Sequence, residues 1–219
     1  MNAQMFDIDM QALFDLRDAV GASQDQMLMA YNRALDRTTK HMYRVSVGMI
    51  IEELAPKSRK QVSRRVRPFI KRRNVTREQA GDLSSVKLWY GLNPFKVSEL
   101  KGTLRQARGK KQQRDPETGR FLKKKNKGDG ATFSPRGRSL SATTFPDSFI
   151  ATRYGHRSIW IRQDGGGIAE ARVDIAESVE DKIDDYIFEN IAAVFMRYFE
   201  QDLRGRVAGN VTTGRRAGR

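Results

Sequence analysis

Apolar residues recur at spacings of three and four along two long stretches of the chain, and each stretch predicts an amphipathic helix. In the first stretch they recur from Met27 until Pro56, which cannot continue a helix. Ser23 and Gln26 precede it at the spacing of a capping box, in which each side chain satisfies an amide at the helix start. We therefore expect a helix over about residues 24–54.

The second stretch lies near the end of the chain and predicts a helix over about residues 176–204. Its apolar positions are Val179, Ile183, Ile187, Ile191, Val194, Tyr198 and Leu203. Acidic residues gather at its start, where they suit the positive end of the helix dipole.

A shorter, strongly basic helix is expected over residues 58–73. Ser58 can cap it, and a thin apolar edge runs along it between many Lys and Arg residues. Pro68 should bend or end this helix, because its ring removes an amide and crowds the preceding turn.

Strands are expected between the helices. Residues 86–90 predict one strand, and residues 95–97 predict a weaker one. Residues 149–152 and 158–162 predict two more, joined across the turn at 154–157. The next loop contains three consecutive glycines, Gly165 to Gly167, which favour a flexible turn over a phosphate cradle.

This order of helices, strands and a final helix predicts an α+β fold, in which long helices cover one face of a small antiparallel sheet. With 219 residues, the chain is expected to form a single domain from residues 23–100 and 139–207. Residues 1–22 predict a short acidic helix or an extended arm. The Gly- and Arg-rich residues 208–219 predict a disordered tail.

Positive charge is concentrated inside the predicted domain. The formal net charge is +15, and residues 101–138 contain thirteen Lys and Arg residues against three acids. The segment RDPETGRF within them has turn chemistry, with Pro116 and Gly119 at favourable positions. We expect residues 101–138 to form a hairpin-like arm or mobile loop rather than a packed element.

Composition excludes several kinds of site and of protein. The chain has no cysteine, so disulfides and thiolate metal sites are excluded, and no apolar stretch is long enough to span a bilayer. The N-terminus lacks the pattern of a secretory signal. We expect a soluble protein of a reducing compartment, or of a particle assembled there.

Enzymatic function is not expected. The two histidines, His41 and His156, have no local partner at catalytic spacing, and the neighbouring Asp184 and Asp185 diverge by about 100° on a helix. No metal-binding, P-loop or dinucleotide motif is found. We expect no catalytic residue, cofactor site or metal site.

Three segments carry a resemblance to a known family. They are the helix and basic segment NRALDRTTKHMYRVSVGMIIEELAPKSRKQVSRRV, the strand VKLWYGLNPFKV before the basic insertion, and the hairpin FPDSFIATRYGHRSIWIRQ before the long terminal helix. In their order and spacing, over about residues 10–207, they resemble the minor tail protein Z family of lambda-like tailed phages and, more loosely, the phage tail-completion proteins.

The resemblance implies a virion structural protein without enzymatic activity. Such a protein lies at the head-proximal end of the tail, near the tail terminator, tail tube and head connector, as a ring with the six-fold symmetry of the tail. The ring encloses the route of the DNA. The resemblance also implies that the protein is assembled in the host cytoplasm.

Basic residues are the candidate contacts with DNA or with a neighbouring subunit, because Lys and Arg meet phosphates or carboxylates without reading sequence. The candidates in the arm and the basic helix, with one apolar residue at the arm's tip, are Lys110, Lys111, Arg114, Arg120, Phe121, Lys123, Lys124, Lys125, Arg64, Arg65, Arg72 and Arg73. The alternative for both segments is a solvated charged surface without a partner. Trp89, Tyr90 and Trp160 are expected in the core rather than in a base-stacking platform.

A second hypothesis is a protein that coats or condenses DNA without sequence preference. The ring hypothesis also gives a role to the acidic segments of the chain, which are net −4 over residues 1–30 (one base, five acids) and net −7 over residues 170–202 (three bases, ten acids). Acidic segments that meet the basic arm of a neighbour would form a head-to-tail interface, the kind that closes rings.

Overall fold

The computed structural model describes residues 10–71, 85–107, 116–120 and 130–212. Helices and small antiparallel sheets together confirm the predicted α+β class. The chain divides into two compact units. The first comprises Met1–Gly48, Arg65–Tyr90 and Asp181–Arg219, and the second comprises Met49–Arg64 and Gly91–Glu180.

This division differs from the single domain that the sequence predicts. The helix α2 (Gln24–Leu54) has 31 residues and contributes to both units. At 1.5 Å per residue it extends over about 46 Å, more than one small hydrophobic core requires.

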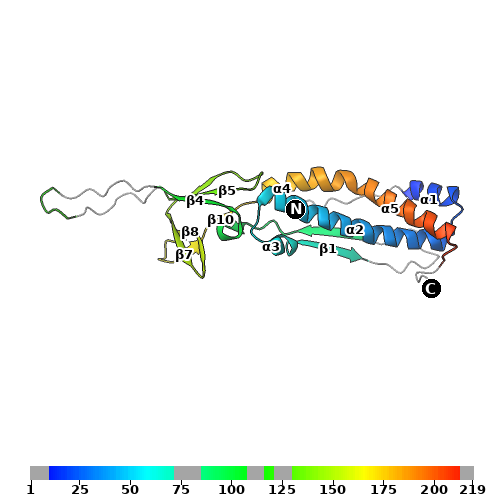
Figure 1. Ribbon diagram of the computed structural model, residues 1–219, viewed down its shortest axis with the longest axis horizontal. Coiled ribbons are helices and arrows are strands. Elements are labelled where there is room, and N and C mark those ends of the chain that lie inside the picture. Colours follow the sequence, from blue (N-terminus) through cyan, green and yellow to red (C-terminus); the bar gives the residue numbers. More distant parts are fainter. Residues whose placement is uncertain (1–9, 72–84, 108–115, 121–129, 213–219) are drawn as a thin grey trace. The chain divides into compact units, whose positions relative to one another are not determined.

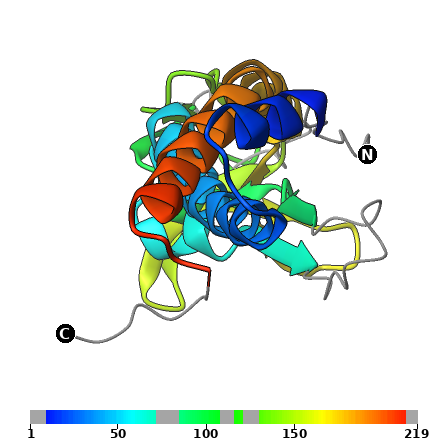
Figure 2. The same cartoon turned by 90° about the vertical axis from the view of Figure 1, so that its right-hand side faces the viewer.

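The first unit is built from helices and one two-stranded sheet. Beside α2 it contains α1 (Met10–Ala19), α5 (Glu189–Ala208) and the antiparallel strands β1 (Val66–Lys71) and β2 (Ser85–Tyr90). Figures 1 and 2 show α1 and α5 lying along α2. The short N-terminal helix that the sequence offers as one alternative is therefore observed over residues 10–19.

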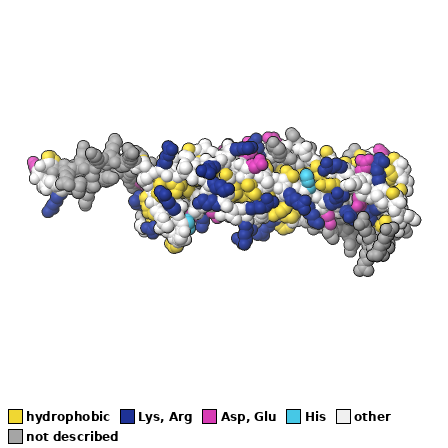
Figure 3. All heavy atoms as spheres, viewed as in Figure 1, with side chains coloured by type: hydrophobic (Ala, Val, Ile, Leu, Met, Phe, Trp, Pro, Cys, Tyr) yellow, Lys and Arg dark blue, Asp and Glu magenta, His cyan; other side chains and the backbone are white. Residues whose placement is uncertain are grey.

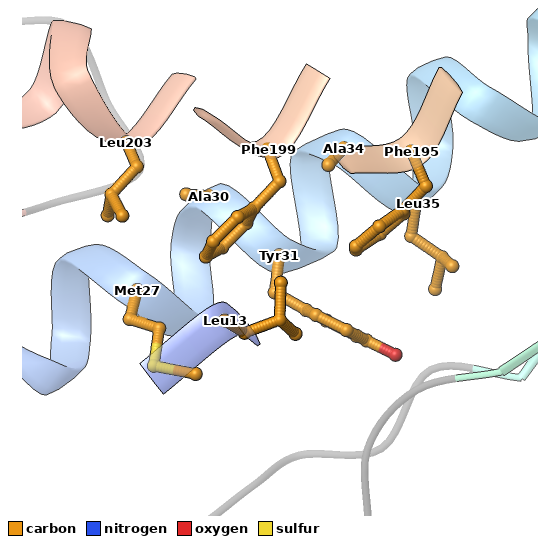
Figure 4. Packing of buried hydrophobic residues seen from close by; sticks show 9 residues of the cluster. All are labelled: Leu13, Met27, Ala30, Tyr31, Ala34, Leu35, Phe195, Phe199 and Leu203. Atoms are coloured by element: carbon orange, nitrogen blue, oxygen red, sulfur yellow. The ribbon is translucent and has the colours of Figure 1, made fainter. Parts of the chain in front are cut away.

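The core of this unit lies between three helices. Figure 4 shows its nine buried side chains, which come from α1, α2 and α5: Leu13, Met27, Ala30, Tyr31, Ala34, Leu35, Phe195, Phe199 and Leu203. The rings of Tyr31 and Phe195 meet edge to face, with centroids 5.4 Å apart. The alanines of α2 let the phenylalanines of α5 approach closely.

The predicted helix over residues 24–54 is confirmed at both ends. The amide of Gln26 donates to the Ser23 hydroxyl at 3.2 Å, and the amide of Ser23 donates to the Gln26 side chain at 2.9 Å. These bonds form the expected capping box. After Leu54 the backbone of Ala55 turns to a φ of 48°, which ends the helix before Pro56.

The predicted basic helix over residues 58–73 is mostly wrong. Ser58 does cap a helix, with its hydroxyl accepting from the amide of Lys60, but this helix, α3, spans only Arg59–Ser63. The chain then enters β1, which pairs with β2 over its whole length. The β-branched and aromatic residues of β1 suit a strand, and Pro68 is tolerated there because a two-stranded sheet has outer edges that need no amide.

The predicted terminal helix exists but is interrupted. It begins as α4 (Ala176–Ile183), continues as a π-helix, η2 (Asp184–Phe188), and ends as α5. A π-helix takes more residues per turn, so it rotates the following residues relative to an uninterrupted α-helix. Phe195 and Phe199 are buried as a result, whereas the predicted positions Val194 and Tyr198 are only half-buried; Leu203 is buried as predicted.

The second unit consists mainly of short antiparallel strands. One sheet contains β4 (Gly102–Gln106), β5 (Ala131–Pro135) and β6 (Thr143–Phe145), and another contains β7 (Ser148–Arg153), β8 (His156–Arg162) and β9 (Ile168–Glu170). β3 (Phe95–Lys96) pairs with β10 (Arg172–Val173), and the 3-10 helix η1 (Val97–Glu99) follows β3. The sequence predicts one sheet, but the strands of the described residues form several small ones.

The end of α2 is fastened to this unit by close backbone contacts. The amide of Lys101 donates to the carbonyl of Ala55 at 2.9 Å, and the Ser139 hydroxyl donates to the carboxylate of Glu53. Gly137 lies against the carbonyl of Glu53, so that a side chain at this position would clash with the backbone. Side chains from the strands complete the core, among them Phe95, Leu100, Phe133, Ile159 and Trp160.

Within the described residues, no helix has both the length and the apolar character needed to cross a membrane.

Candidate anion-contact surfaces

The basic insertion, residues 108–129, connects the paired strands β4 and β5, so its two ends lie side by side. β4 and β5 pair in antiparallel register from Gly102 opposite Pro135 to Gln106 opposite Ala131, and the amide of Ala107 then donates to the carbonyl of Gly130 at 3.1 Å. Residues 108–129 therefore leave and rejoin the second unit between two hydrogen-bonded strands. The ladder closes the base of the insertion.

The two ends of the predicted arm are packed, which corrects the expectation that residues 101–138 contain no packed element. Ala131 and Phe133 of β5 are buried, and β5 is the central strand of its sheet. The physical reason is the alternation in β5, where buried and half-buried residues follow each other along the strand. The hairpin form that the sequence also predicts is confirmed for these strands.

Two polar side chains join this base to the β7–β8 hairpin. Gln106 accepts from the amide of Ile150 at 3.0 Å and donates to the carbonyl of Gly130 at 3.2 Å. Ser148 accepts from the amide of Ala131 at 2.8 Å and donates to the carbonyl of Phe145 at 2.6 Å. Through these hydrogen bonds the base of the insertion is held at several backbone groups of the neighbouring strands.

The described part of the insertion, residues 116–120, is exposed to solvent. Residues 116–118 form a turn and Gly119 has a φ of 63°, as the turn chemistry of this segment predicts. Residues 116–120 are all exposed, including Arg120.

Most predicted contact residues lie outside the described residues. These are Lys110, Lys111, Arg114, Phe121, Lys123, Lys124, Lys125, Arg72 and Arg73. Of the other three, Arg64 is exposed at the end of α3, Arg65 is half-buried just before β1, and Arg120 follows the turn of the insertion. Arg64 and Arg65 are consecutive residues between α3 and β1, whereas Arg120 belongs to the exposed turn of the insertion.

Further basic residues surround the base of the insertion. Lys101, Arg105, Arg136 and Arg138 are exposed on or beside β4 and β5. Arg138 lies 3.9 Å from Glu52, an exposed pair that solvent screens strongly. Figure 3 shows Lys and Arg side chains spread over the visible face, with fewer acids between them.

The β7–β8 hairpin carries a basic and aromatic surface that the sequence reasoning missed. The guanidinium of Arg162 lies 4.5 Å from the centroid of the Phe149 ring, and that of Arg153 lies 5.9 Å from it. Tyr154, at the turn, is 84% exposed. The available signal was the composition of residues 148–163, which contain three arginines and no acid.

The base-stacking alternative fails for two of its three aromatic residues. Trp160 is 4% exposed and donates from its indole nitrogen to the carbonyl of Ala151 at 3.0 Å. The Tyr90 hydroxyl lies 2.8 Å from the Ser46 hydroxyl, and burial raises the pKa of Tyr90 to about 12 although this hydrogen bond lowers it. Trp89 does not lie in the core as expected, because 42% of its surface is exposed.

A network of Ser158, His156 and Glu170 invites comparison with a catalytic triad. Its order is unsuitable, because Ser158 donates to Glu170 Oε1 at 2.7 Å, while His156 Nε2 lies 3.3 Å from Glu170 Oε2. The serine hydroxyl thus contacts the carboxylate rather than the imidazole, and Ser158 is fully buried. The arrangement suits a structural role.

Hydrogen bonds dominate the ionisation of Glu170. Burial alone raises the pKa of this carboxyl, but hydrogen bonds from Ser158, from Ser98 and from His156 outweigh burial and lower the pKa below its ordinary value. The ionised form is therefore favoured in the folded protein. Among the described residues, no group of three His, Cys, Asp or Glu side chains is placed to hold a metal ion.

Comparison of this chain with protein-family models, curated proteins and solved structures finds no match.

Proposed function

We propose that this protein is a structural subunit of a tailed-phage virion, which forms a ring at the head-proximal end of the tail and joins the tail to the head connector around the DNA route. Its partners would be further copies of itself, the tail terminator or tail tube, and the connector. The ring would be a hexamer, and the protein would act without catalysis.

The closed base of the basic insertion is the observation that carries this proposal. A strongly basic segment whose two ends are held side by side by paired strands is attached to the folded unit at the same point in every copy. The side chains of Gln106 and Ser148 hold that point. Such attachment suits a protein whose insertion must meet the same partner in every copy of a symmetric assembly.

Complementary charge supports contact between copies. Exposed acids follow one another along α4 and η2: Glu177, Glu180, Asp181, Asp184 and Asp185. The exposed bases around the insertion have the opposite sign. Two different patches of opposite charge on one chain favour a head-to-tail interface, which generates rings when the rotation closes.

Replacement of the insertion tests this proposal. Residues 108–129 would be replaced by Asn-Gly, which favours a tight hairpin turn and preserves the pairing of β4 with β5. A second variant keeps the native length and replaces only the Lys and Arg residues of this segment by Gln, so that it tests charge separately from length. We expect both variants to fold and both to lose assembly, measured as solution mass or as incorporation into particles. If both assemble as the native chain does, the proposal is wrong.

The second candidate is a protein that coats DNA without sequence preference, and the exposed arginines of the β7–β8 hairpin favour it. A coating protein should bind duplex DNA tightly at low salt, lose affinity steeply as salt rises, and show no fixed oligomer. A ring subunit should show a discrete oligomer and modest affinity for DNA. Measurement of mass and of DNA affinity on the same preparation separates the two.

A further inference from the structure

The β7–β8 hairpin extends beyond the third strand of its sheet. β9 pairs only with residues 160–162 of β8, whereas β7 and β8 pair as far as Arg153 opposite His156. Ser158 is buried and bonded to Glu170 of β9, so only residues 152–157 form a two-stranded ribbon beyond the packed part of the sheet, and it is closed by Tyr154 and Gly155 (Figure 1). The major groove of B-DNA is wide enough to admit such a ribbon.

The charge of the hairpin is uniformly positive. Arg153, Arg157 and Arg162 are all exposed, and none of the ion pairs observed among the described residues involves them. Arg204, by comparison, lies 2.9 Å from Glu200. Among the described residues the three hairpin arginines thus make no ion pair, a state that they share with the exposed Arg105 and Arg136.

Phe149 organises two of these arginines. The guanidinium groups of Arg153 and Arg162 lie 5.9 and 4.5 Å from the centroid of its ring. Arg162 also donates to the carbonyl of Asp147 at 3.4 Å. Stacking restrains a guanidinium without consuming its N–H donors, and its planar fork matches the geometry of phosphate.

Tyr154 occupies an unusual place for an aromatic residue. Its φ is 51°, a left-handed conformation that non-glycine residues rarely adopt, and turns of this kind favour Asn, Asp or Gly. It is also 84% exposed, with its ring 5.8 Å from that of Trp160. A strained, exposed aromatic residue beside arginines is expected at a binding surface.

From these observations we infer that the β7–β8 hairpin binds double-stranded DNA without sequence preference, with Arg153, Arg157 and Arg162 contacting phosphates and Tyr154 at the leading end of the ribbon. The alternative partner is an acidic protein surface. DNA is favoured because the exposed side chains of the hairpin are almost all cationic or polar, a composition typical of DNA interfaces and unusual in the core of protein interfaces. The inference deepens the second candidate function by naming the surface that would meet DNA, and it does not depend on the proposed ring.

The test measures binding of the full chain to a short labelled duplex of random sequence, by fluorescence anisotropy, between about 50 and 200 mM salt. The variant R153Q/R157Q/R162Q should bind more weakly. It should also reduce the steepness of the plot of log affinity against log salt by about 2.7, because each phosphate contact contributes about 0.9 to that slope.

A matched control removes the same charge elsewhere. The variant R44Q/R197Q/R204Q replaces three exposed arginines of α2 and α5, and it should change the slope by less than about 1. If both triple variants change the slope equally, only the total charge matters and the inference is wrong. It is also wrong if the hairpin variant retains the native slope.

Two further measurements keep the result decisive. If the hairpin variant does not fold, the single variants R153Q, R157Q and R162Q test the same claim, each with an expected slope loss of about 0.9. If the hairpin variant keeps the native DNA slope but lowers the solution mass, the hairpin is a protein interface and the inference fails. The mass of the native chain tests the ring separately, so failure of one proposal is distinguishable from failure of the other.

Discussion

Ser158 of β8 donates a 2.7 Å hydrogen bond to Oε1 of Glu170 in β9. The same carboxylate oxygen accepts from the amide of Ser98 at 3.1 Å, and the other oxygen lies 3.3 Å from His156. One buried carboxylate therefore connects two strands with η1 and supports the root of the β7–β8 hairpin.

We expect the substitution Glu170→Gln to destabilise the fold at neutral pH by about 1–3 kcal/mol, because it weakens hydrogen bonds made to a buried charge. The lowered pKa of Glu170 means that its contribution is present above the unfolded-state pKa and is lost as pH falls through the folded pKa. Thermal melts from neutral pH to below the ordinary pKa of Glu check both effects. The native chain should lose more stability on acidification than the Gln variant; equal losses would contradict this role.

The base of the insertion offers a second test, at Gly130. This residue has a φ of 78°, and an added Cβ would clash with the carbonyl of Phe145. Gly166 has a similar φ of 80° but no atom within 4 Å of such a Cβ. Gly166→Ala should therefore cost only the backbone term of about 1 kcal/mol, and Gly130→Ala clearly more. Equal losses of unfolding free energy in denaturant titrations would show that the base is not closely packed.

The charge pair in the first unit allows a similar comparison. Asp202 lies 2.7 Å from the buried Arg206 and 3.2 Å from Arg33, so Asp202→Ala leaves a buried cation without its partner. We expect a loss of about 3 kcal/mol. Glu200→Ala removes the exposed pair with Arg204 and should change stability by about 0.5 kcal/mol or less. Chemical denaturation of both variants measures the two losses of unfolding free energy, and equal losses would contradict a structural role for Asp202.

The register of α5 is tested by two neighbouring aromatic residues. Phe199 is fully buried, whereas Tyr198 is half-buried and stacks with Arg37 at 4.3 Å. Phe199→Ala should cost about 3–5 kcal/mol, as is typical of a buried phenylalanine, and Tyr198→Ala should cost distinctly less. An uninterrupted helix, with Tyr198 in the core, would reverse this order.

The sequence predicted the features that depend on neighbouring residues. The capping box at Ser23 and the helix cap at Ser58 are local, since they join groups two or three residues apart, and both are observed. The hairpin turn at Tyr154 and Gly155 was likewise predicted from nearby strand and turn signals. Periodicity over a long window located α2 with its ends.

Features that depend on distant residues were not predicted. The basic helix was expected to continue beyond Ser63, but pairing with residues 85–90 determines the structure there. The η2 interruption shifts the buried face by a change in helix type that leaves no compositional mark. Gln106 contacts a strand that lies 44 residues away, so only the folded arrangement reveals its role at the base of the insertion.

The solution mass of the native chain tests the central claim most directly. Light scattering coupled to size-exclusion chromatography should detect one discrete oligomer of the 25.0 kDa protomer, and the resemblance implies a hexamer. Electron microscopy of the same fraction should show closed rings. A protein that stays monomeric at every concentration tested, and that is not incorporated into particles, would contradict the account.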